Sequence, residues 1–249
     1  MATGERLRIG CWLELPSPEI AEITAAAGYD FAVLDVEHGA IGIETLGRML
    51  AAFAASPTAT VVRVPEAGEG WIKHALDAGA GAVMVPRVED AATAARLSAF
   101  ATYGPAGRRG EGLGVARASR WGREPGAYRD RWRATGGLVL QIESPAGLAA
   151  AAAIAATPGV TQLFFGPADF AAALGVDRGD PQVAAGARGT AEAARAAGRE
   201  AGVFPFPGAG FAALAAMGFT HAAEVSDVGL LVGGLADHLA ATRAGLADG

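Results

Sequence analysis

Short apolar runs rich in β-branched and aromatic residues recur along most of this chain. Glycine, proline or polar residues bound each run, and this pattern is typical of strands that are buried on both faces. The run Ala82-Val83-Met84-Val85 is a clear example. The predicted strands are Arg8–Leu13, Phe31–Leu34, Thr60–Val64, Ala82–Val85, Leu138–Ile142, Thr161–Phe165, Gly202–Phe206 and Thr220–Val225.

Segments with helical character lie between and after these strands. Most of them are rich in alanine, and several carry residues that begin or end helices. Ser17 precedes Pro18 as an N-cap, and Gly28, Gly79 and Gly198 stand where helices end. The predicted helices are Pro18–Ala27, Ile43–Ala54, Gly70–Ala78, Asp90–Thr102, Ala146–Ala156, Gln182–Gly198, Gly210–Met217 and Val228–Ala244.

The regular alternation of strand and helix predicts a parallel sheet, because each helix must carry the chain back across it. Eight such units are the number that closes a barrel, and a length of 249 residues suits one barrel domain. We therefore predict an α/β fold, a (β/α)8 TIM barrel formed by a single domain over residues 1–249. An open doubly wound sheet is the alternative, and it too collects ligands at the carboxyl ends of its strands.

Tyr103–Gly136 fits no single strand-helix unit and is rich in glycine and arginine. Long irregular segments are uncommon in compact domains unless they have a function. We therefore expect a lid, a rim or a subunit contact in this segment.

Composition and charge narrow the class of protein. With 51% hydrophobic and 18% charged residues, the chain can bury a large core. The net charge of −6 argues against a nucleic-acid partner. The uncharged stretches at 144–168 and 201–223 contain prolines and glycines, which argues against membrane spans. Met1–Ile9 lacks the features of a signal peptide, and the single cysteine, Cys11, fits a reducing compartment, so we expect a cytoplasmic protein.

Acidic residues follow three of the predicted strands. If these strands are neighbours in one parallel barrel, their carboxyl ends bring the acids to one mouth. A buried carboxylate is unfavourable unless a cation compensates it, and carboxylates with no cysteine or second histidine nearby favour a hard, oxygen-binding ion. The clusters are Asp35-Val36-Glu37-His38, Gln141-Ile142-Glu143 and Gly166-Pro167-Ala168-Asp169.

Each candidate residue also has a purely structural interpretation. Glu143 and Asp169 could pair with Arg63 in an ion network, and Arg63 itself could form a salt bridge across the barrel end instead of meeting a substrate. A histidine at a strand end, such as His38, is more often a packed hydrogen-bonding residue than a catalyst. Asp77, near the end of a predicted helix, is by default a cap or a surface acid.

Several motifs occur in a fixed order along nearly the whole chain. They are Gly10-Cys11-Trp12, Gly28-Tyr29-Asp30-Phe31, Asp35-Val36-Glu37-His38-Gly39, Val61-Val62-Arg63, Leu76-Asp77-Ala78-Gly79-Ala80-Gly81, Gly107-Arg108-Arg109-Gly110, Ala116-Arg117-Ala118-Ser119-Arg120, Gln141-Ile142-Glu143, Gly166-Pro167-Ala168-Asp169 and Ser226-Asp227-Val228-Gly229. With this order and spacing the chain resembles the HpcH/HpaI aldolases. These are class II metal-dependent pyruvate aldolases that include 4-hydroxy-2-oxoheptanedioate aldolase.

The resemblance implies a role for each matching residue. Glu143 and Asp169 would be the ligands of a divalent cofactor, Mg²⁺, Mn²⁺ or Co²⁺. His38 would be the acid/base, oriented by Asp35, and Arg63 would stabilise the keto oxygen and the enolate.

The resemblance also implies how substrate and subunits are held. Gln141 would be a polar neighbour of the substrate, and the segment Gly166-Pro167-Ala168-Asp169 would bind the pyruvate carboxylate through the N–H groups of Ala168 and Asp169. Asp77 resembles an acid that family members contribute across a subunit boundary. The implied assembly is a homo-oligomer, a hexamer built as a trimer of dimers or a dimer of trimers.

The implied reaction adds the enolate of pyruvate, or of a related 2-oxo acid such as hydroxypyruvate, to an aldehyde, and cleaves 4-hydroxy-2-oxo acids in reverse. Decarboxylation of oxaloacetate at the same site is one alternative, and a non-catalytic barrel that binds 2-oxo acids is another. A Schiff-base aldolase is a poor fit, because the only lysine, Lys73, lies in a predicted helix.

Overall fold

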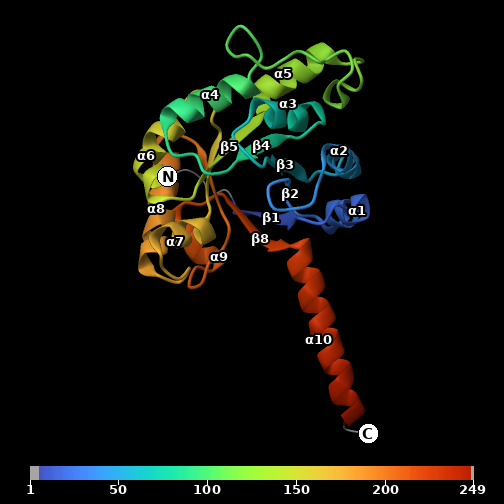
Figure 1. The fold of residues 1–249 in the computed structure, drawn as a ribbon, viewed down its shortest axis with the longest axis vertical. Helices are drawn as coiled ribbons and strands as arrows, with labels where there is room; N and C mark the ends of the chain where they lie inside the picture. The colour runs from blue at the N-terminus through green and yellow to red at the C-terminus, as the bar shows by residue number, and fades with distance from the viewer. Residues whose placement is uncertain (1–5, 248–249) are drawn as a thin grey trace.

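The computed structural model describes residues 6–247. All eight strands run parallel and close a barrel in sequence order, with β8 pairing back to β1 (Figure 1). The strands are β1 (Arg8–Leu13), β2 (Phe31–Asp35), β3 (Ala59–Arg63), β4 (Ala82–Val85), β5 (Gly137–Ile142), β6 (Gln162–Phe165), β7 (Glu200–Val203) and β8 (His221–Ser226). The sequence prediction that Met1–Ile9 contains no signal peptide falls partly outside the described residues, because residues 1–5 are not described.

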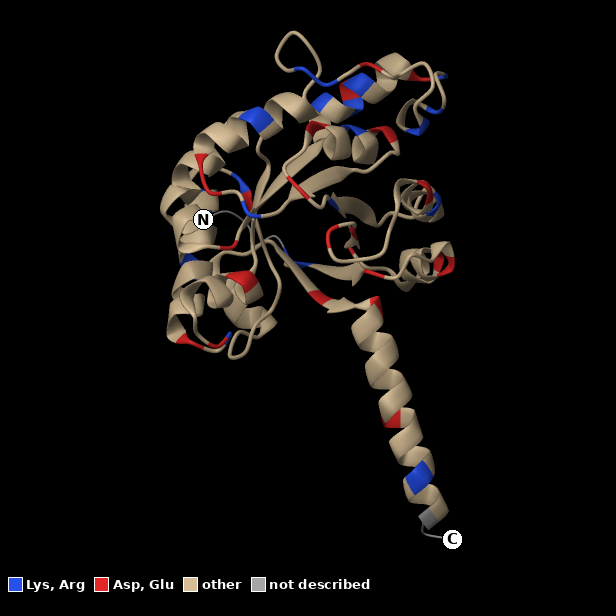
Figure 2. Ribbon diagram, in the orientation of Figure 1, with Lys and Arg blue, Asp and Glu red and all other residues tan. Residues whose placement is uncertain are grey.

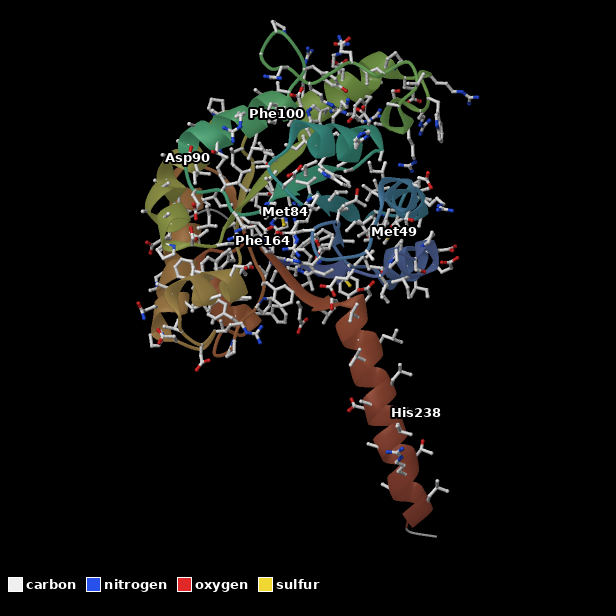
Figure 3. The ribbon with its side chains drawn as sticks, viewed as in Figure 1. Met49, Met84, Asp90, Phe100, Phe164 and His238 are labelled. Atoms are coloured by element: carbon white, nitrogen blue, oxygen red, sulfur yellow. The ribbon has the colours of Figure 1, made fainter. Side chains whose placement is uncertain are left out.

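The strands divide their apolar side chains between two cores, because successive residues of a strand point to opposite faces. In β2, Val33 lies in the interior cluster, whereas Ala32 and Leu34 pack in the layer between strands and helices. Figure 3 places Met84 and Phe164 near the centre of the barrel and Met49 and Phe100 among the outer helices. The buried interior cluster consists of Trp12, Phe31, Val33, Val61, Met84, Val139, Phe164 and Ala223.

Helices cover the outside of the barrel over most of its circumference (Figure 1). Cap chemistry fixes several of their ends. The Ser17 hydroxyl accepts the Ile20 N–H at 3.2 Å, and Gly28 ends the same helix in the left-handed region at φ 87°. The helices are α1 (Pro18–Ala27), α2 (Ile43–Ala52), α3 (Glu69–Asp77), α4 (Ala91–Ala101), the 3₁₀ turn η1 (Arg117–Ser119), α5 (Pro125–Thr135), α6 (Pro145–Ala156), α7 (Pro167–Leu174), α8 (Pro181–Ala196), α9 (Phe211–Met217) and α10 (Asp227–Ala247).

The predicted fold class is confirmed, and the differences from the predicted elements are local. β7 ends at Val203 rather than at Phe206. Pro205 has no amide hydrogen to donate to a strand ladder. Two helices were not predicted: α5, which lies inside the segment expected to be irregular, and α7, which has Gly166 as its N-cap and Pro167 as its first residue.

The segment Tyr103–Gly136 lies at the end of the barrel opposite to the carboxyl ends of the strands. Arg117 donates to the carbonyl oxygens of Ala78 at 2.8 Å and Leu50 at 3.3 Å, and Tyr128 donates to that of Leu76 at 3.2 Å. Leu50 and Leu76 lie in the last turns of α2 and α3, and Ala78 follows α3 directly. A (β/α)8 barrel places the carboxyl ends of its helices beside the amino ends of its strands. A lid over this chain's own mouth is therefore excluded, whereas a rim or subunit contact stays a prediction.

α10 leaves the barrel instead of packing back onto it, and Figure 1 shows it extending away from the other helices. The expectation that every helix returns across the sheet is wrong for this element. Between residues 228 and 246 its charged side chains are Asp237 and Arg243, and Figure 2 shows the helix almost free of charge. Its exposed large apolar residues are Leu230, Leu231, Val232, Leu235, Leu239 and Leu246. Within residues 6–247, no helix has both the length and the apolarity needed to cross a membrane.

Candidate active site

An arginine and two acids meet where β2 and β3 end. Asp35 and Arg63 are register partners as the last residues of these neighbouring strands. Arg63 donates from Nε to Asp35 Oδ1 at 2.9 Å, and its Nη1 lies 2.9 Å from Glu37 Oε2. The guanidinium also lies over the Trp12 ring, 4.5 Å from its centroid. These contacts fix a buried cation at the mouth of the barrel.

The turn after β2 carries His38. Asp35 Oδ1 accepts the backbone N–H groups of Glu37 at 3.0 Å and His38 at 3.3 Å. The imidazole is 65% exposed, and its Nε2 lies 3.9 Å from Glu37 Oε2. Asp35 thus orients the backbone of His38 and the Arg63 guanidinium rather than the imidazole, so Glu37 is the acid that faces the His38 ring.

Glu143 follows β5 and is only 6% exposed. Gln141 Nε2 donates to its Oε1 at 2.7 Å, and the Arg87 backbone N–H donates to its Oε2 at 3.0 Å. Burial, followed by the negative charge of Asp169, raises the pKa of Glu143 to about 7. A Cβ at residue 166 would lie 2.5 Å from Glu143 Oε1, so the glycine there makes room for this carboxylate.

Asp169 lies in the first turn of α7, directly after β6. The residues before it, Gly166 and Pro167, are buried, whereas Ala168 and Asp169 are exposed. The first N–H groups of a helix have no partner within the helix, so the start of α7 offers the Ala168 and Asp169 amides to an anion. The predicted convergence of Glu143, Asp169 and Arg63 on one mouth agrees with these positions.

The donor chemistry of this mouth fits a hard divalent cation. Glu143 and Asp169 present carboxylate oxygens close enough for one charge to oppose ionisation of the other. A shared cation removes that penalty. Within residues 6–247 no group of three or more His, Cys, Asp or Glu side chains is arranged to hold a metal. Two protein carboxylates would leave the other coordination positions to water or substrate, as is usual for Mg²⁺.

Asp77 is not brought to this mouth within one chain. It is the last residue of α3, and its Oδ1 accepts from Arg109 Nη2 at 2.8 Å. The Arg109 side chain is fully buried and lies 4.5 Å from the centroid of the Tyr103 ring. Asp77 is therefore the partner of a buried arginine rather than a helix cap, and a role across a subunit boundary stays a prediction.

Several side chains at the mouth received no role in the sequence analysis. Glu14 follows β1, and burial together with Asp35 and Asp227 raises the pKa of its carboxyl group. Asp227 begins α10 and accepts the N–H groups of Glu14 and Leu15, each at 3.0 Å. Arg87 follows β4 by two positions. Their sequence positions could have identified them, because each of these residues follows a strand directly or after one residue. The carboxyl ends of the strands are where active sites form in such barrels.

A closed barrel of parallel strands with acids, an arginine and an imidazole at their carboxyl ends is the arrangement of a (β/α)8-barrel enzyme. This chain belongs to the HpcH/HpaI aldolase/citrate lyase family, whose model matches residues 8–231.

Individual relatives cover most of the chain. A hydroxypyruvate/pyruvate aldolase from Chromohalobacter salexigens is 39% identical over 226 residues, which are 90% of this chain and 89% of the relative. A 2-keto-3-deoxy-L-rhamnonate aldolase from Klebsiella pneumoniae is 39% identical over 197 residues, 78% of this chain and 73% of the relative. The crystal structure of an HpcH/HpaI aldolase/citrate lyase family protein from Burkholderia cenocepacia matches with a TM-score of 0.87 and 34% identity, covering 96% of this chain and 95% of that chain. These findings confirm the predicted family and the aldolase class.

Proposed function

We propose that this chain is a divalent-metal-dependent aldolase. It joins the enolate of pyruvate, or of a related 2-oxo acid such as hydroxypyruvate, to an aldehyde, and it cleaves 4-hydroxy-2-oxo acids in reverse. The observation that carries this proposal is the buried Glu143 carboxylate, held by Gln141 and the Arg87 N–H beside Asp169. Relatives named as aldolases support the reaction class.

Different groups at the mouth bind different parts of the 2-oxo acid. A divalent ion held by Glu143 and Asp169, with Mg²⁺, Mn²⁺ and Co²⁺ as the proposed ions, would polarise the keto group and acidify the hydrogens on C3. Arg63 stabilises negative charge on the keto oxygen, since its pairing with Asp35 and Glu37 leaves N–H groups free to donate. The amides of Ala168 and Asp169 hold the carboxylate of the substrate.

His38 carries the proton. Its exposed imidazole at the mouth can accept a proton from C3 and return one later. In the addition, C3 loses a proton, a bond forms between C3 and the aldehyde carbon, and the aldehyde oxygen gains a proton. In the cleavage, the 4-hydroxyl group loses its proton as the C3–C4 bond breaks, and C3 is protonated to give pyruvate.

Decarboxylation of oxaloacetate is a second candidate, because loss of CO₂ leaves the same pyruvate enolate beside Arg63. A non-catalytic barrel that binds 2-oxo acids has less support, since binding alone needs no imidazole at the mouth. Product analysis with and without an aldehyde separates the two reactions.

Exchange of the pyruvate methyl protons in deuterated water tests the proposal. We expect exchange that requires Mg²⁺, Mn²⁺ or Co²⁺ and that stops with a chelator, measured by the loss of the methyl signal in proton NMR. Exchange needs no aldehyde, so it reports enolate formation alone. The absence of exchange with each of the three ions would favour a binding protein and contradict the proposal.

We also infer a cytoplasmic homo-oligomer in which α10 packs against a second copy of this chain. A helix that is apolar on most sides is usually buried. Leu231 is 50% exposed and Leu235 is 64% exposed on α10. A second identical chain supplies the same helix and a barrel onto which its own α10 does not pack back, so the two chains can cover each other reciprocally.

Charges placed on α10 are expected to weaken this assembly. The double variant Leu231→Glu/Leu235→Glu buries two carboxylates if the helix lies in an interface, so we expect sedimentation to show a smaller assembly at micromolar concentration. Ala152→Glu on the exposed face of α6 adds a similar charge as a control and is expected to leave the mass unchanged. The interface would be contradicted if the chain without substitutions were a monomer. It would also be contradicted if the double variant formed an assembly of the same mass as that chain.

A further inference from the structure

We propose that Arg87 forms the acceptor end of the site and selects aldehydes that carry an anionic group, such as a carboxylate or a phosphate. This inference rests on the proposed aldolase function and specifies the class of its second substrate. None of the roles considered so far uses the Arg87 side chain. The main chain of Arg87 already belongs to the site, because its N–H holds Glu143.

The position of Arg87 is fixed by bonds to the end of β5. Its N–H donates to Glu143 Oε2 at 3.0 Å, and the next N–H, that of Val88, donates to the Gln141 carbonyl oxygen at 3.2 Å. The base of the side chain therefore stands beside the carboxylate assigned to the metal. Under the proposed function the donor substrate binds beside Glu143, so the backbone of Arg87 borders the donor site.

The backbone of Arg87 is strained. Its φ of 55° lies in the left-handed region, which residues with a Cβ rarely adopt. Glycine or asparagine would adopt this conformation more easily. Strained residues of this kind concentrate at functional sites. The left-handed backbone accompanies the bond from the Arg87 N–H to Glu143, and the guanidinium takes no part in that bond.

The Arg87 guanidinium is available for a ligand. The residue is exposed, and within residues 6–247 its side chain forms no hydrogen bond or ion pair. Arg63, in contrast, is held by Asp35 and Glu37. The acids that follow Arg87 have other partners, because Glu89 accepts from the Ser144 hydroxyl at 2.6 Å and Asp90 caps α4.

The negative charge at the mouth explains how the Arg87 guanidinium could contribute to acceptor binding. Glu14, Glu37 and Asp169 are carboxylates at the same end of the barrel, and they would repel an incoming aldehyde that carries its own negative charge. A guanidinium binds a carboxylate or phosphate through two parallel hydrogen bonds and offsets this repulsion. A neutral aldehyde would need no such residue.

The test compares matched acceptors in aldol addition with pyruvate. Succinic semialdehyde and its neutral methyl ester form the carboxylate pair, and glyceraldehyde 3-phosphate and glyceraldehyde form the phosphate pair. We expect the unchanged chain to favour the anionic member of at least one pair, which also identifies the anion. In Arg87→Asn, whose new residue tolerates the left-handed backbone, we expect kcat/KM for that anionic acceptor to fall about 10- to 100-fold. The ratio of kcat/KM for that anionic acceptor to kcat/KM for its neutral partner should fall with it, and Arg87→Lys should restore part of this preference.

Controls separate this inference from the proposed function. Arg96→Asn removes an exposed arginine from the neighbouring helix α4 and should leave both preferences unchanged. Pyruvate proton exchange, measured without an aldehyde, reports the enolate step in Arg87→Asn separately from acceptor selection. If Arg87→Asn keeps the acceptor preference and shows normal exchange, the proposed role of Arg87 is overturned and the proposed aldolase function is not. Loss of exchange in Arg87→Asn would assign the residue to the enolate step and overturn the acceptor role, and absence of exchange in the unchanged chain would overturn the proposed function itself.

Discussion

Glu143→Gln is expected to lower metal-dependent exchange of the pyruvate methyl protons on the order of 10³-fold. The variant keeps the size of the side chain and removes its charge. Metal ions stabilise charge in enolate-forming reactions by several kcal/mol, and each 1.36 kcal/mol of barrier is about tenfold in rate. The new side chain could accept from only one of its two present donors, because its amide nitrogen would face either Gln141 Nε2 or the Arg87 N–H.

Metal affinity gives a readout that is independent of turnover. Residues that only support a metal ligand contribute about 10- to 100-fold to affinity, so loss of the ligand itself should weaken Mn²⁺ binding by more than about 100-fold in titration calorimetry. Glu89→Gln, in the loop between β4 and α4, is a matched control that removes a carboxylate bound to Ser144. If Glu143→Gln bound Mn²⁺ as tightly as the unchanged chain, Glu143 would not be a ligand.

The fold could be predicted from the sequence because its signal is repeated. Strands such as Ala82–Val85 are apolar along their whole length, and only a parallel sheet covered by helices buries both faces of such a strand. Helix starts such as Ser17-Pro18 carry their own cap chemistry, and the first predicted helix has the observed bounds, Pro18–Ala27. α10 shows the limit, because an alanine- and leucine-rich sequence predicts a helix but not the surface that covers it.

The site could be predicted in part for a related reason. Glu143 and Asp169 follow strands that are neighbours in the barrel, so their convergence follows from strand order alone. The partners of each group depend on side-chain geometry, which sequence position does not give. Asp35 was expected to orient the His38 ring, and it pairs with Arg63 instead. The bond from Arg87 to Glu143 could not be foreseen, because it comes from a left-handed backbone at a non-glycine residue.

His38→Ala is expected to lower aldol turnover about 10²–10⁴-fold while Mn²⁺ binding persists, because general acid–base catalysis contributes a factor of that size. His74→Ala, which removes an exposed imidazole from α3, is the matched control and should leave turnover unchanged.

The exposure of His38 makes this variant a clean probe. Its ring is 65% exposed and lies 3.9 Å from the nearest carboxylate oxygen, Glu37 Oε2, so truncation leaves no buried group unpaired and stability should change little. A loss of turnover with unchanged thermal stability and metal affinity would therefore come from the missing proton carrier. Unchanged turnover would instead assign proton transfer to another group at the mouth, and Glu14, whose burial raises its pKa, would be the next candidate.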